Sequence, residues 1–561
     1  MTFFHRRAFS SITEWFVGRA MTTFLFLMPI AVLAFVMRDM IFFDRFFFNN
    51  DIILNLLPYL AYRGAGGQLI MQGILSGFPL FVSTGSAWFN TVAAMLFSRF
   101  SATHAYVILT IGNLLLTYGF SYLYARIIGL SRPAAILAAM TFMFSGQVAL
   151  WASSTINTGY YFILPATLYL FELAISKERF ARVGLLGGVG LLLGFGWLSA
   201  HVQFVVYIHT FFFVYALVRI HRYGNKNWQV TVLSLGIPYV ISAFIGLPVI
   251  GSILSFQHET LRSGGVSLVE YAGSGFMPWD FIHYLSPFWN VSFLSVASPN
   301  LYLGVLPFLI LAIALFSYKE LENRYAALYV WTFVFCLLAS IRYSPVAIAL
   351  HYLPFWNAFR EAPRIMFVGG FAEAMVVGIG FEYIYAQWNT VAFYRLRVVR
   401  IVAYIFVYVA LPTIVLFSLV RAFYFTAIET RLDQYFLEHT YAHTTQLPVS
   451  HYLAVINTYL HQILDQFSLY DPQILFALLF IMLALVFFRF QKYSPLAYVS
   501  LIVVGVAGLN FASVYAIYYP SVASSGISSP PQTAFAIFSR QKDNPSPYRV
   551  FSIFPAMTVY N

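Results

Sequence analysis

Long apolar stretches recur along the whole chain, and they constrain its fold more than any other feature. About 20 helical residues span the hydrocarbon core of a bilayer, and apolar stretches of roughly this length recur about 13 times. With 60% hydrophobic residues and a mean hydropathy of +0.77, a soluble globular protein is excluded. We therefore predict an all-α, polytopic integral membrane protein. The predicted spans are 22–38, 104–124, 133–151, 158–175, 183–199, 202–218, 229–254, 301–317, 325–341, 366–386, 401–420, 474–489 and 497–517.

The positive charge of the chain follows the predicted topology. The formal net charge is +11, but 18 of the 31 basic residues fall in the short segments that face inward if the N-terminus is inside. Cytoplasmic loops of membrane proteins carry such an excess of Lys and Arg. The charge is therefore a topology signal and argues against a nucleic-acid partner. We expect a multi-pass protein of the inner (cytoplasmic) membrane, surrounded by lipid, with a cytoplasmic N-terminus and an extracytoplasmic C-terminus.

The spans divide the chain into three predicted parts. Residues 1–21 form a basic, amphipathic cytoplasmic N-terminus, and residues 22–517 form the transmembrane domain. Residues 518–561 read as an extracytoplasmic linker followed by the start of a truncated or vestigial C-terminal domain, whose first strand is PYRVFSIF. Long irregular segments on a rigid scaffold often carry functional sites. The outer segments of the transmembrane domain are 39–101, 256–300, 342–364 and 421–472.

Two aspartates of the first outer segment are candidate general bases. Asp44 and Asp51 follow the first span at the membrane surface. Desolvation there can raise the pKa of a carboxyl group, and lipid-linked substrates present their phosphates at the same depth. Either residue could equally cap the N-terminus of a helix, since each is followed by apolar sequence.

Arginines in the outer segments are candidate phosphate ligands. Arg262, Arg360 and Arg364 stand beside predicted membrane entry points, and His258 lies close to Arg262 in sequence. A guanidinium group binds phosphate in bidentate fashion. The alternative is that these arginines snorkel to lipid headgroups.

Polar residues inside predicted spans are costly in a membrane and therefore informative. His201 and Gln203 lie in GWLSAHVQFVVY and Gln147 in FMFSGQVALW, all towards the outer side, while Glu373 lies near the outer end of its span. The first three could line one cavity that opens outward. Alternatively, each could hydrogen-bond to a neighbouring helix.

The sequence does not predict a metal site. His439 and His443 have a spacing that could hold a metal on one helical face, but no third ligand stands at a fixed distance. An amphipathic helix on the outer leaflet is the preferred interpretation of this segment. A divalent cation such as Mg²⁺ or Mn²⁺ as cofactor is compatible with the chain, but no ligand set requires it.

Taken in order, the motifs resemble those of the YfhO-type bacterial membrane proteins of the GT-C glycosyltransferase superfamily. The resemblance covers nearly the whole chain. It implies an all-helical GT-C fold with an outer active site that transfers a sugar from a polyprenyl-phosphate donor to an acceptor in the cell envelope. The stretches that carry it are NNDIILNLLPYLAY, GILSGFPLFVSTGSAWFN, FMFSGQ, WLSAHVQFVVY, QHETLRSG, YLGVLPFLILAIALF, LPFWNAFREAPRIMFVGGFAEAMVVGIGFEYI and PYRVFSIF.

The resemblance also implies roles for single residues. Asp51 matches the presumed base of the family, although Asn50 stands where the family usually has glycine. His201 and Gln203 match a His-Pro-Gln-like element in which Val202 replaces the proline. Arg360 and Arg364 match an FRxPxR-like loop.

These observations together predict an inverting GT-C-type glycosyltransferase. Asp51, or else Asp44, would deprotonate the acceptor hydroxyl, while Arg360, Arg364 and Arg262 would hold the phosphate of the donor, which is also the leaving group. Two other functions stay open. A transporter of lipid-linked glycans would need no base, and a non-catalytic subunit of a larger membrane complex would keep the fold without the chemistry.

Overall fold

The described residues of this chain form two compact units. Unit 1 comprises Met1–Val36, Tyr118–Leu150 and Val266–Tyr518, and unit 2 comprises Met37–Thr117, Trp151–Gly265 and Tyr519–Asn561. The structure is a computed structural model. It describes residues 23–47, 70–71, 78–79, 91–148, 161–223, 228–256, 264–284, 301–353, 356–387, 404, 408, 411–439, 449–466, 468–469, 504–505, 507–508, 510–511 and 521–523.

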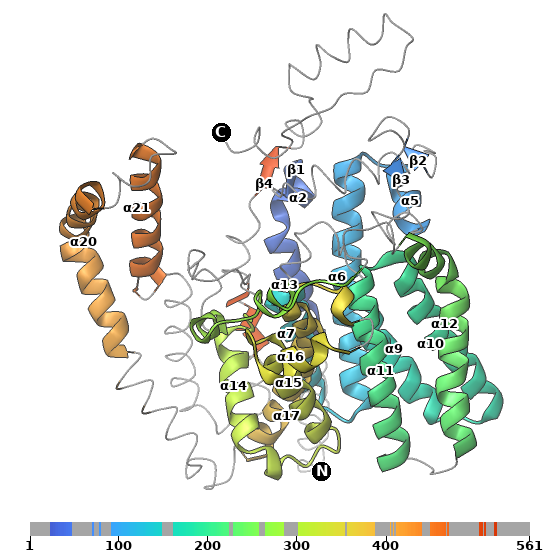
Figure 1. The fold of residues 1–561 in the computed structure, drawn as a ribbon. Coiled ribbons are helices and arrows are strands. Elements are labelled where there is room, and N and C mark those ends of the chain that lie inside the picture. The colour runs from blue at the N-terminus through green and yellow to red at the C-terminus, as the bar shows by residue number, and fades with distance from the viewer. Residues whose placement is uncertain are drawn as a thin grey trace, which may run out of the picture. The chain divides into compact units, whose positions relative to one another are not determined.

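Helices dominate both units (Figure 1). Unit 2 holds α2 (Arg38–Phe42), β1 (Arg45–Phe47), β2 (Ile70–Met71), β3 (Phe78–Pro79), α5 (Thr91–Phe97), the first part of α6 (Ala102–Ile127), α9 (Ile163–Ile175), α10 (Arg179–Ser199), α11 (Val202–Tyr223), α12 (Trp228–Phe256) and β4 (Ser521–Ala523). Unit 1 holds Thr23–Val36, the rest of α6, α7 (Arg132–Met143), α13 (Leu268–Ala272), η5 (Pro278–Tyr284), α14 (Val305–Phe316), η6 (Tyr318–Glu320), α15 (Ala326–Ser340), α16 (Pro345–His351), η7 (Trp356–Ala358), η8 (Ala362–Ile365), α17 (Met366–Gln387), α20 (Leu411–His439) and α21 (Val449–Gln466).

The helices confirm a multi-pass, all-helical membrane protein in outline. Each of the six long helices overlaps a predicted span, and four shorter apolar helices overlap four more. The total of 13 spans stays a prediction, because most of 474–489 and 497–517 lies outside the described residues. The six helices that are long and apolar enough to cross a membrane, among the residues described, are Ala102–Ile127, Phe180–Ser199, Val202–Arg222, Thr231–Ser255, Ala362–Ala386 and Leu411–His439.

The α17 helix is the centre of unit 1. Its membrane-crossing stretch is 94% buried, because α7, α14 and α15 pack around it. A Cβ atom at Gly378 would lie 2.8 Å from the Cβ of Ala138 on α7, so this glycine permits the close approach of the two helices. Small residues at such contacts allow tight packing in a membrane, where no hydrophobic effect drives helices together.

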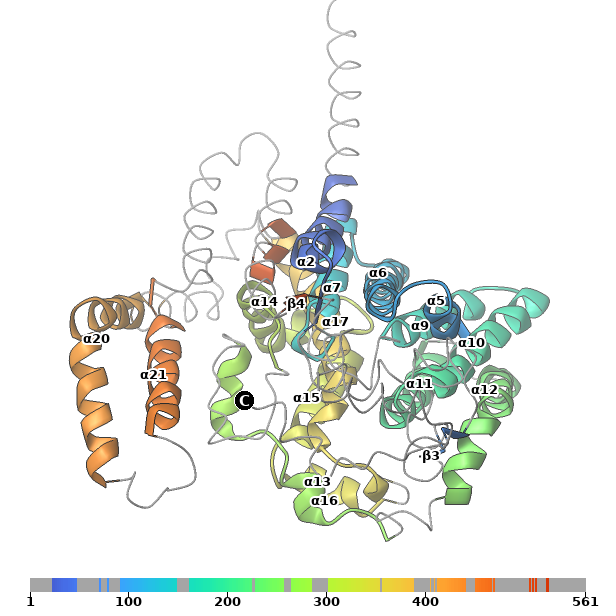
Figure 2. The same ribbon diagram turned by 90° about the horizontal axis from the view of Figure 1, so that it is seen from above.

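In unit 2, α10 and α12 lie side by side (Figures 1 and 2). Gly190 and Gly194 of α10 face Ile241 and Ile245 of α12, and a Cβ atom at either glycine would come within 2.8 Å of an isoleucine carbon. The α9 helix packs on the same α10 helix. Small residues thus set the packing of both units.

The predicted outer segment 421–472 contains a helical hairpin. The predicted span ends at Val420, whereas α20 continues to His439 and packs against α21 (Figures 1 and 2). Arg421 Nε lies 2.5 Å from Asp465 Oδ1, which ties the middle of α20 to the end of α21. The α20 stretch is 0% buried, so its apolar half can face lipid. The hairpin had no simple sequence signal, because polar and apolar residues alternate beyond Arg421 without a helix-breaking residue before His439.

Two segments far apart in the sequence pair in unit 2. The strand β1 pairs with β4 in an antiparallel register that places Phe46 opposite Val522. The first strand follows the first predicted span, and the second strand follows the last one. Because paired strands must lie on the same side of a membrane, the pairing requires that any membrane crossings between them be even in number.

Candidate functional site

The structure describes five of the eight residues that the sequence predicts for a site. Arg360 and Arg364 belong to unit 1, while Asp44, His201 and Gln203 belong to unit 2. The remaining three, Asp51, His258 and Arg262, lie outside the described residues.

Two of the predicted outer segments are joined through their backbones within unit 1. Phe276 N–H donates to Ser340 O at 2.7 Å, and Arg342 N–H donates back to Phe276 O at 3.0 Å. Gly275 makes this approach possible, since a Cβ atom there would lie 2.4 Å from the Arg342 nitrogen. Segment 264–284 therefore lies directly against segment 341–365.

A third backbone hydrogen bond connects the first of these segments to the loop that carries Arg360 and Arg364. Val266 N–H donates to Asn357 O at 2.8 Å. Val266 follows Arg262 by four residues in the sequence, and Asn357 precedes Arg360 by three. The described chain next to Arg262 is thus attached to the loop that carries the other two candidate phosphate ligands.

Arg360 and Arg364 converge on one carboxylate, that of Glu361. Arg364 binds Glu361 Oε2 through Nε at 2.9 Å and through Nη2 at 2.7 Å. Arg360 Nε lies 3.3 Å from the other carboxylate oxygen, Oε1. The Arg364 side chain is 7% exposed, whereas those of Arg360 and Glu361 are 44% and 38% exposed. The site therefore has a buried arginine at its base and two groups that reach solvent.

The backbone of Glu361 is held in an unfavourable conformation. Its φ of 58° lies in the left-handed region, although Glu has a Cβ atom that makes this region costly. Such a conformation costs about 1–2 kcal/mol for an L-residue. Glu361 directly precedes η8, where the Ala362-Pro363 sequence starts the turn that carries Arg364. Strained residues of this kind cluster at functional sites, where surrounding contacts hold them.

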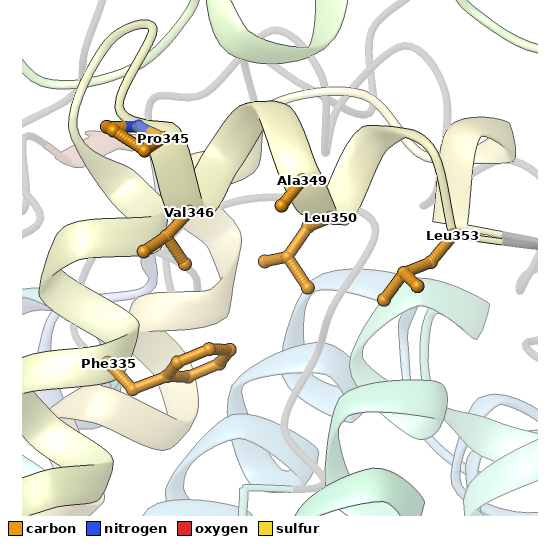
Figure 3. A pocket seen from close by; sticks show the side chains of 6 residues that line it. All are labelled: Phe335, Pro345, Val346, Ala349, Leu350 and Leu353. Atoms are coloured by element: carbon orange, nitrogen blue, oxygen red, sulfur yellow. The ribbon is translucent and has the colours of Figure 1, made fainter.

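An apolar pocket of about 360 Å³ lies between α15 and α16 of unit 1, next to the segment that carries the arginines (Figure 3). Phe335 of α15 forms one side, and α16 together with Leu353, two residues beyond its end, forms the other. Figure 3 shows Val346, Leu350 and Leu353 pointing towards the Phe335 side of the pocket. Ser344 caps α16 by accepting a hydrogen bond from Ala347 N–H at 3.0 Å, and Pro345 occupies the first helical position. A pocket of this composition suits a hydrocarbon chain.

Aromatic contacts hold α16 and the arginine loop in place. Trp356 Nε1 donates to Tyr271 Oη at 2.8 Å, and the Tyr271 ring lies 5.6 Å from the His351 ring, measured between centroids. Burial raises the pKa of Tyr271 to about 12, so its hydroxyl stays protonated near neutral pH. These contacts join α13, α16 and η7 at the edge of the pocket.

Sequence reasoning singled out Glu373 but missed the buried acidic and aromatic neighbours that η5 places near it. Asp280, His283 and Tyr284 of η5 and Glu373 of α17 are each less than 5% exposed. Tyr284 Oη donates to Glu373 Oε1, and Met277 N–H donates to Asp280 Oδ2 at 2.7 Å. Burial lowers the pKa of His283, although the charge of Asp280 acts in the opposite direction. Burial, together with the charge of Glu373, raises the pKa of Tyr284 well above its ordinary value. Asp and His within the aromatic segment PWDFIHY were the available signal.

The described site residues of unit 2 lie in two parts of the chain. Asp44 directly precedes β1, and His201 and Gln203 stand at the start of α11. Asp44 stands between α2 and β1, so it does not cap a helix, and its φ is 47°. Its side chain is 67% exposed, and Oδ1 lies 3.8 Å from His104 Nε2. The His104 Nδ1 atom in turn lies 2.6 Å from Ser101 Oγ, at the start of α6. Asp44 is thus an accessible carboxylate with an imidazole partner.

His201 and Gln203 make hydrogen bonds at the start of α11. Gln203 is buried, and its Nε2 donates to Tyr207 Oη one turn later, at 2.8 Å. His201 Nδ1 accepts from Gln203 N–H at 3.3 Å, at the start of α11. Within the described part of the chain, no three His, Cys, Asp or Glu side chains are placed to hold a metal ion. His439, at the end of α20, stacks on Tyr435 with the ring centroids 4.4 Å apart.

The comparisons with known proteins give no family assignment. No protein-family model matches this chain, and no curated protein matches it. The resemblance to YfhO-type proteins therefore stays an expectation from the sequence motifs.

Proposed function

We propose that this chain is a GT-C-type membrane glycosyltransferase that uses a polyprenyl-phosphate-linked sugar donor and acts on the extracytoplasmic face of the membrane. The acceptor would be a component of the cell envelope. The resemblance to YfhO-type proteins motivates the reaction class. The arrangement of residues in unit 1 supports the site.

The observation that carries the proposal is the pairing of Arg360 and Arg364 around one acidic group. Both guanidinium groups bind the oxygens of Glu361. A phosphate group carries the same kind of charge-bearing oxygens, and a planar guanidinium matches them with two parallel hydrogen bonds. Two arginines that already converge on an anion are thus suited to the phosphate of a donor lipid.

The apolar pocket supports the proposal that the donor carries a lipid chain. It lies between α15 and α16, and Leu353 at its end precedes Arg360 by only seven residues. A lipid-linked sugar combines a hydrocarbon chain with a phosphate headgroup. One segment of unit 1 offers a surface for each.

The strand pairing supports the proposed topology. The tail strand β4 lies on the same side of the membrane as β1, which follows the first span. An odd total number of spans satisfies this pairing, as 13 does. With a cytoplasmic N-terminus, both strands and Asp44 would face outward.

The proposed reaction is a single displacement at the anomeric carbon of the donor sugar. The acceptor oxygen forms the new bond, while the bond between the anomeric carbon and the phosphate oxygen breaks. Asp51 accepts the proton of the acceptor hydroxyl, and Asp44 is the alternative base. The lipid phosphate leaves with the bonding electron pair, and Arg360 and Arg364 stabilise its negative charge. The configuration of the sugar is inverted.

Mass spectrometry of envelope glycans tests this proposal. A strain that lacks the protein should lose one glycan substituent, and expression of the wild-type chain should restore it. Restoration by an Asp51→Asn, Asp44→Asn double variant would favour the non-catalytic subunit. An unchanged glycan profile in the strain without the protein would contradict the transferase. Accumulation of a lipid-linked glycan on the cytoplasmic side would favour a transporter.

A further inference from the structure

Glu361 occupies the position in which a phosphate ligand would bind the two arginines. Its Oε2 atom uses both the Nε and the Nη2 of Arg364, which form the edge that a bidentate ligand needs. Its Oε1 atom lies against Arg360 Nε. A second anion cannot use the same donor atoms while the carboxylate remains there, because like charges at this distance repel each other.

The environment of Glu361 allows it to leave. Its side chain is 38% exposed, so the carboxylate can turn into water without crossing the protein interior. Its left-handed backbone is strained, and release of the ion pairs removes a contact that holds this strain in place. Arg364, by contrast, is buried and keeps its position in η8. Within the Glu361–Arg364 pair, the mobile partner is therefore the acid.

We infer that Glu361 is an internal counter-ion of the arginine pair, which a phosphate ligand must displace in order to bind. The inference rests on the proposed use of Arg360 and Arg364 as phosphate ligands and adds a positioning residue to that site. While the ligand is away, Glu361 keeps both guanidinium groups aimed at one point. When a phosphate binds, its oxygens replace the carboxylate oxygens.

The need to displace the Glu361 carboxylate would determine which anions the arginine pair binds. A weakly charged anion competes poorly with a carboxylate that is tethered to the site and therefore present at a high effective concentration. A phosphate with two negative charges or with two bidentate contacts competes better. Glu361 would thus exclude anions that make no bidentate contact, whereas the singly charged phosphodiester of the donor can compete through two of its oxygens. It would also lower the affinity for the phosphate product.

Titration calorimetry of the purified full-length protein in detergent, with inorganic pyrophosphate as the probe, tests this inference. Glu361→Gln keeps the shape of the side chain but removes its charge, and it should bind pyrophosphate at least tenfold more tightly than the wild type. Glu361→Gly also removes the carboxylate and tolerates the positive φ, so it tests the same point if the Gln variant does not fold. Glu270→Gln is the matched control, because it removes an exposed acid on α13 of the same unit. It should bind like the wild type.

The outcomes separate the two proposals. Tighter binding by both Glu361 variants, lost again when Arg364→Lys is added, supports the counter-ion. If the wild type binds pyrophosphate and both Glu361 variants bind it equally or less tightly, Glu361 only supports the loop, and the inference is overturned while the phosphate site stands. If neither the wild type nor the variants bind pyrophosphate, the phosphate site itself is contradicted, and the counter-ion with it.

Discussion

Arg219 of α11 binds Glu172 of α9 inside unit 2. Arg219 Nε donates to both carboxylate oxygens of Glu172, at 2.8 and 3.0 Å, and Tyr215 Oη donates to Oε1 at 2.6 Å. Both charged side chains are less than 10% exposed. Because the two helices are joined through this buried pair, each partner depends on the other for the compensation of its charge.

Removal of one partner should destabilise unit 2 strongly. Glu172→Ala leaves a buried guanidinium without its carboxylate, which typically costs about 3–5 kcal/mol. Thermal unfolding in detergent should show a clear decrease in the midpoint. The double replacement Glu172→Leu, Arg219→Met should recover most of the loss, since it removes both charges. Glu178→Gln, which changes an exposed acid at the start of α10, should have little effect. Equal midpoints for Glu172→Ala and Glu178→Gln would show that the pair contributes nothing.

Labelling of single cysteines tests the topology. A cysteine at Ser524, just after β4, should react with an impermeant maleimide in intact cells, whereas one at Asn225 should stay unlabelled. The native Cys336 is buried in α15 and gives a low background. The reverse labelling pattern would place the arginine pair and the candidate bases on the cytoplasmic side.

The buried arginine should be more sensitive to substitution than its partner. Arg364→Lys keeps the charge but loses the planar fork, so we expect at least tenfold weaker use of a lipid-phosphate donor. Arg364→Ala should be worse, and Arg360→Lys should be milder because Arg360 is half exposed. Sugar transfer in isolated membranes is the measurement. Wild-type activity in a folded Arg364→Ala variant would mean that segment 342–364 only caps the helices.

Asparagine substitutions separate a base from a structural aspartate. Asp51→Asn removes the proton acceptor but keeps a capping oxygen, so turnover should fall by about a hundredfold or more if Asp51 is the base. Asp44→Asn should keep its fold, because Asn tolerates a positive φ, and it should cost less activity. The opposite order of the two losses would assign the base to Asp44. The rates of sugar transfer and the thermal midpoints should be measured together.

His283 should make stability depend on pH. Its pKa is lowered in the folded protein by burial, so the unfolded chain binds a proton more readily. Its contribution to stability is therefore present above its unfolded pKa of about 6.5 and is lost as the pH falls towards the folded pKa. Thermal midpoints measured from pH 8 to pH 5 should decrease less in His283→Gln than in the wild type. His221→Gln, which removes an exposed imidazole, is the control. Identical pH profiles of the wild type and His283→Gln would contradict this role.

The sequence predicted the helical elements better than the contacts of the site. Apolar stretches of membrane length identified the six long helices, because hydrophobicity over about 20 residues is a strong local signal. The end of α20 was not predicted, since a helix can continue beyond the membrane without a change in its backbone pattern. For Arg360 and Arg364, the residue type indicated an anion site, but not that Glu361 fills it.

By itself, the sequence determined that this chain enters a membrane, because it contains apolar stretches of membrane length. The basic residues of its short loops indicated the orientation of the chain in that membrane. It also singled out the residue types that suit a phosphate. Tertiary structure alone decided which of them meet. The backbone of Gly275 lies against Arg342, 67 positions later in the chain, and Tyr284 bonds to Glu373, 89 positions later. The paired strands β1 and β4 are hundreds of positions apart. Such contacts depend on helix packing and backbone approach in three dimensions, which local sequence patterns do not encode.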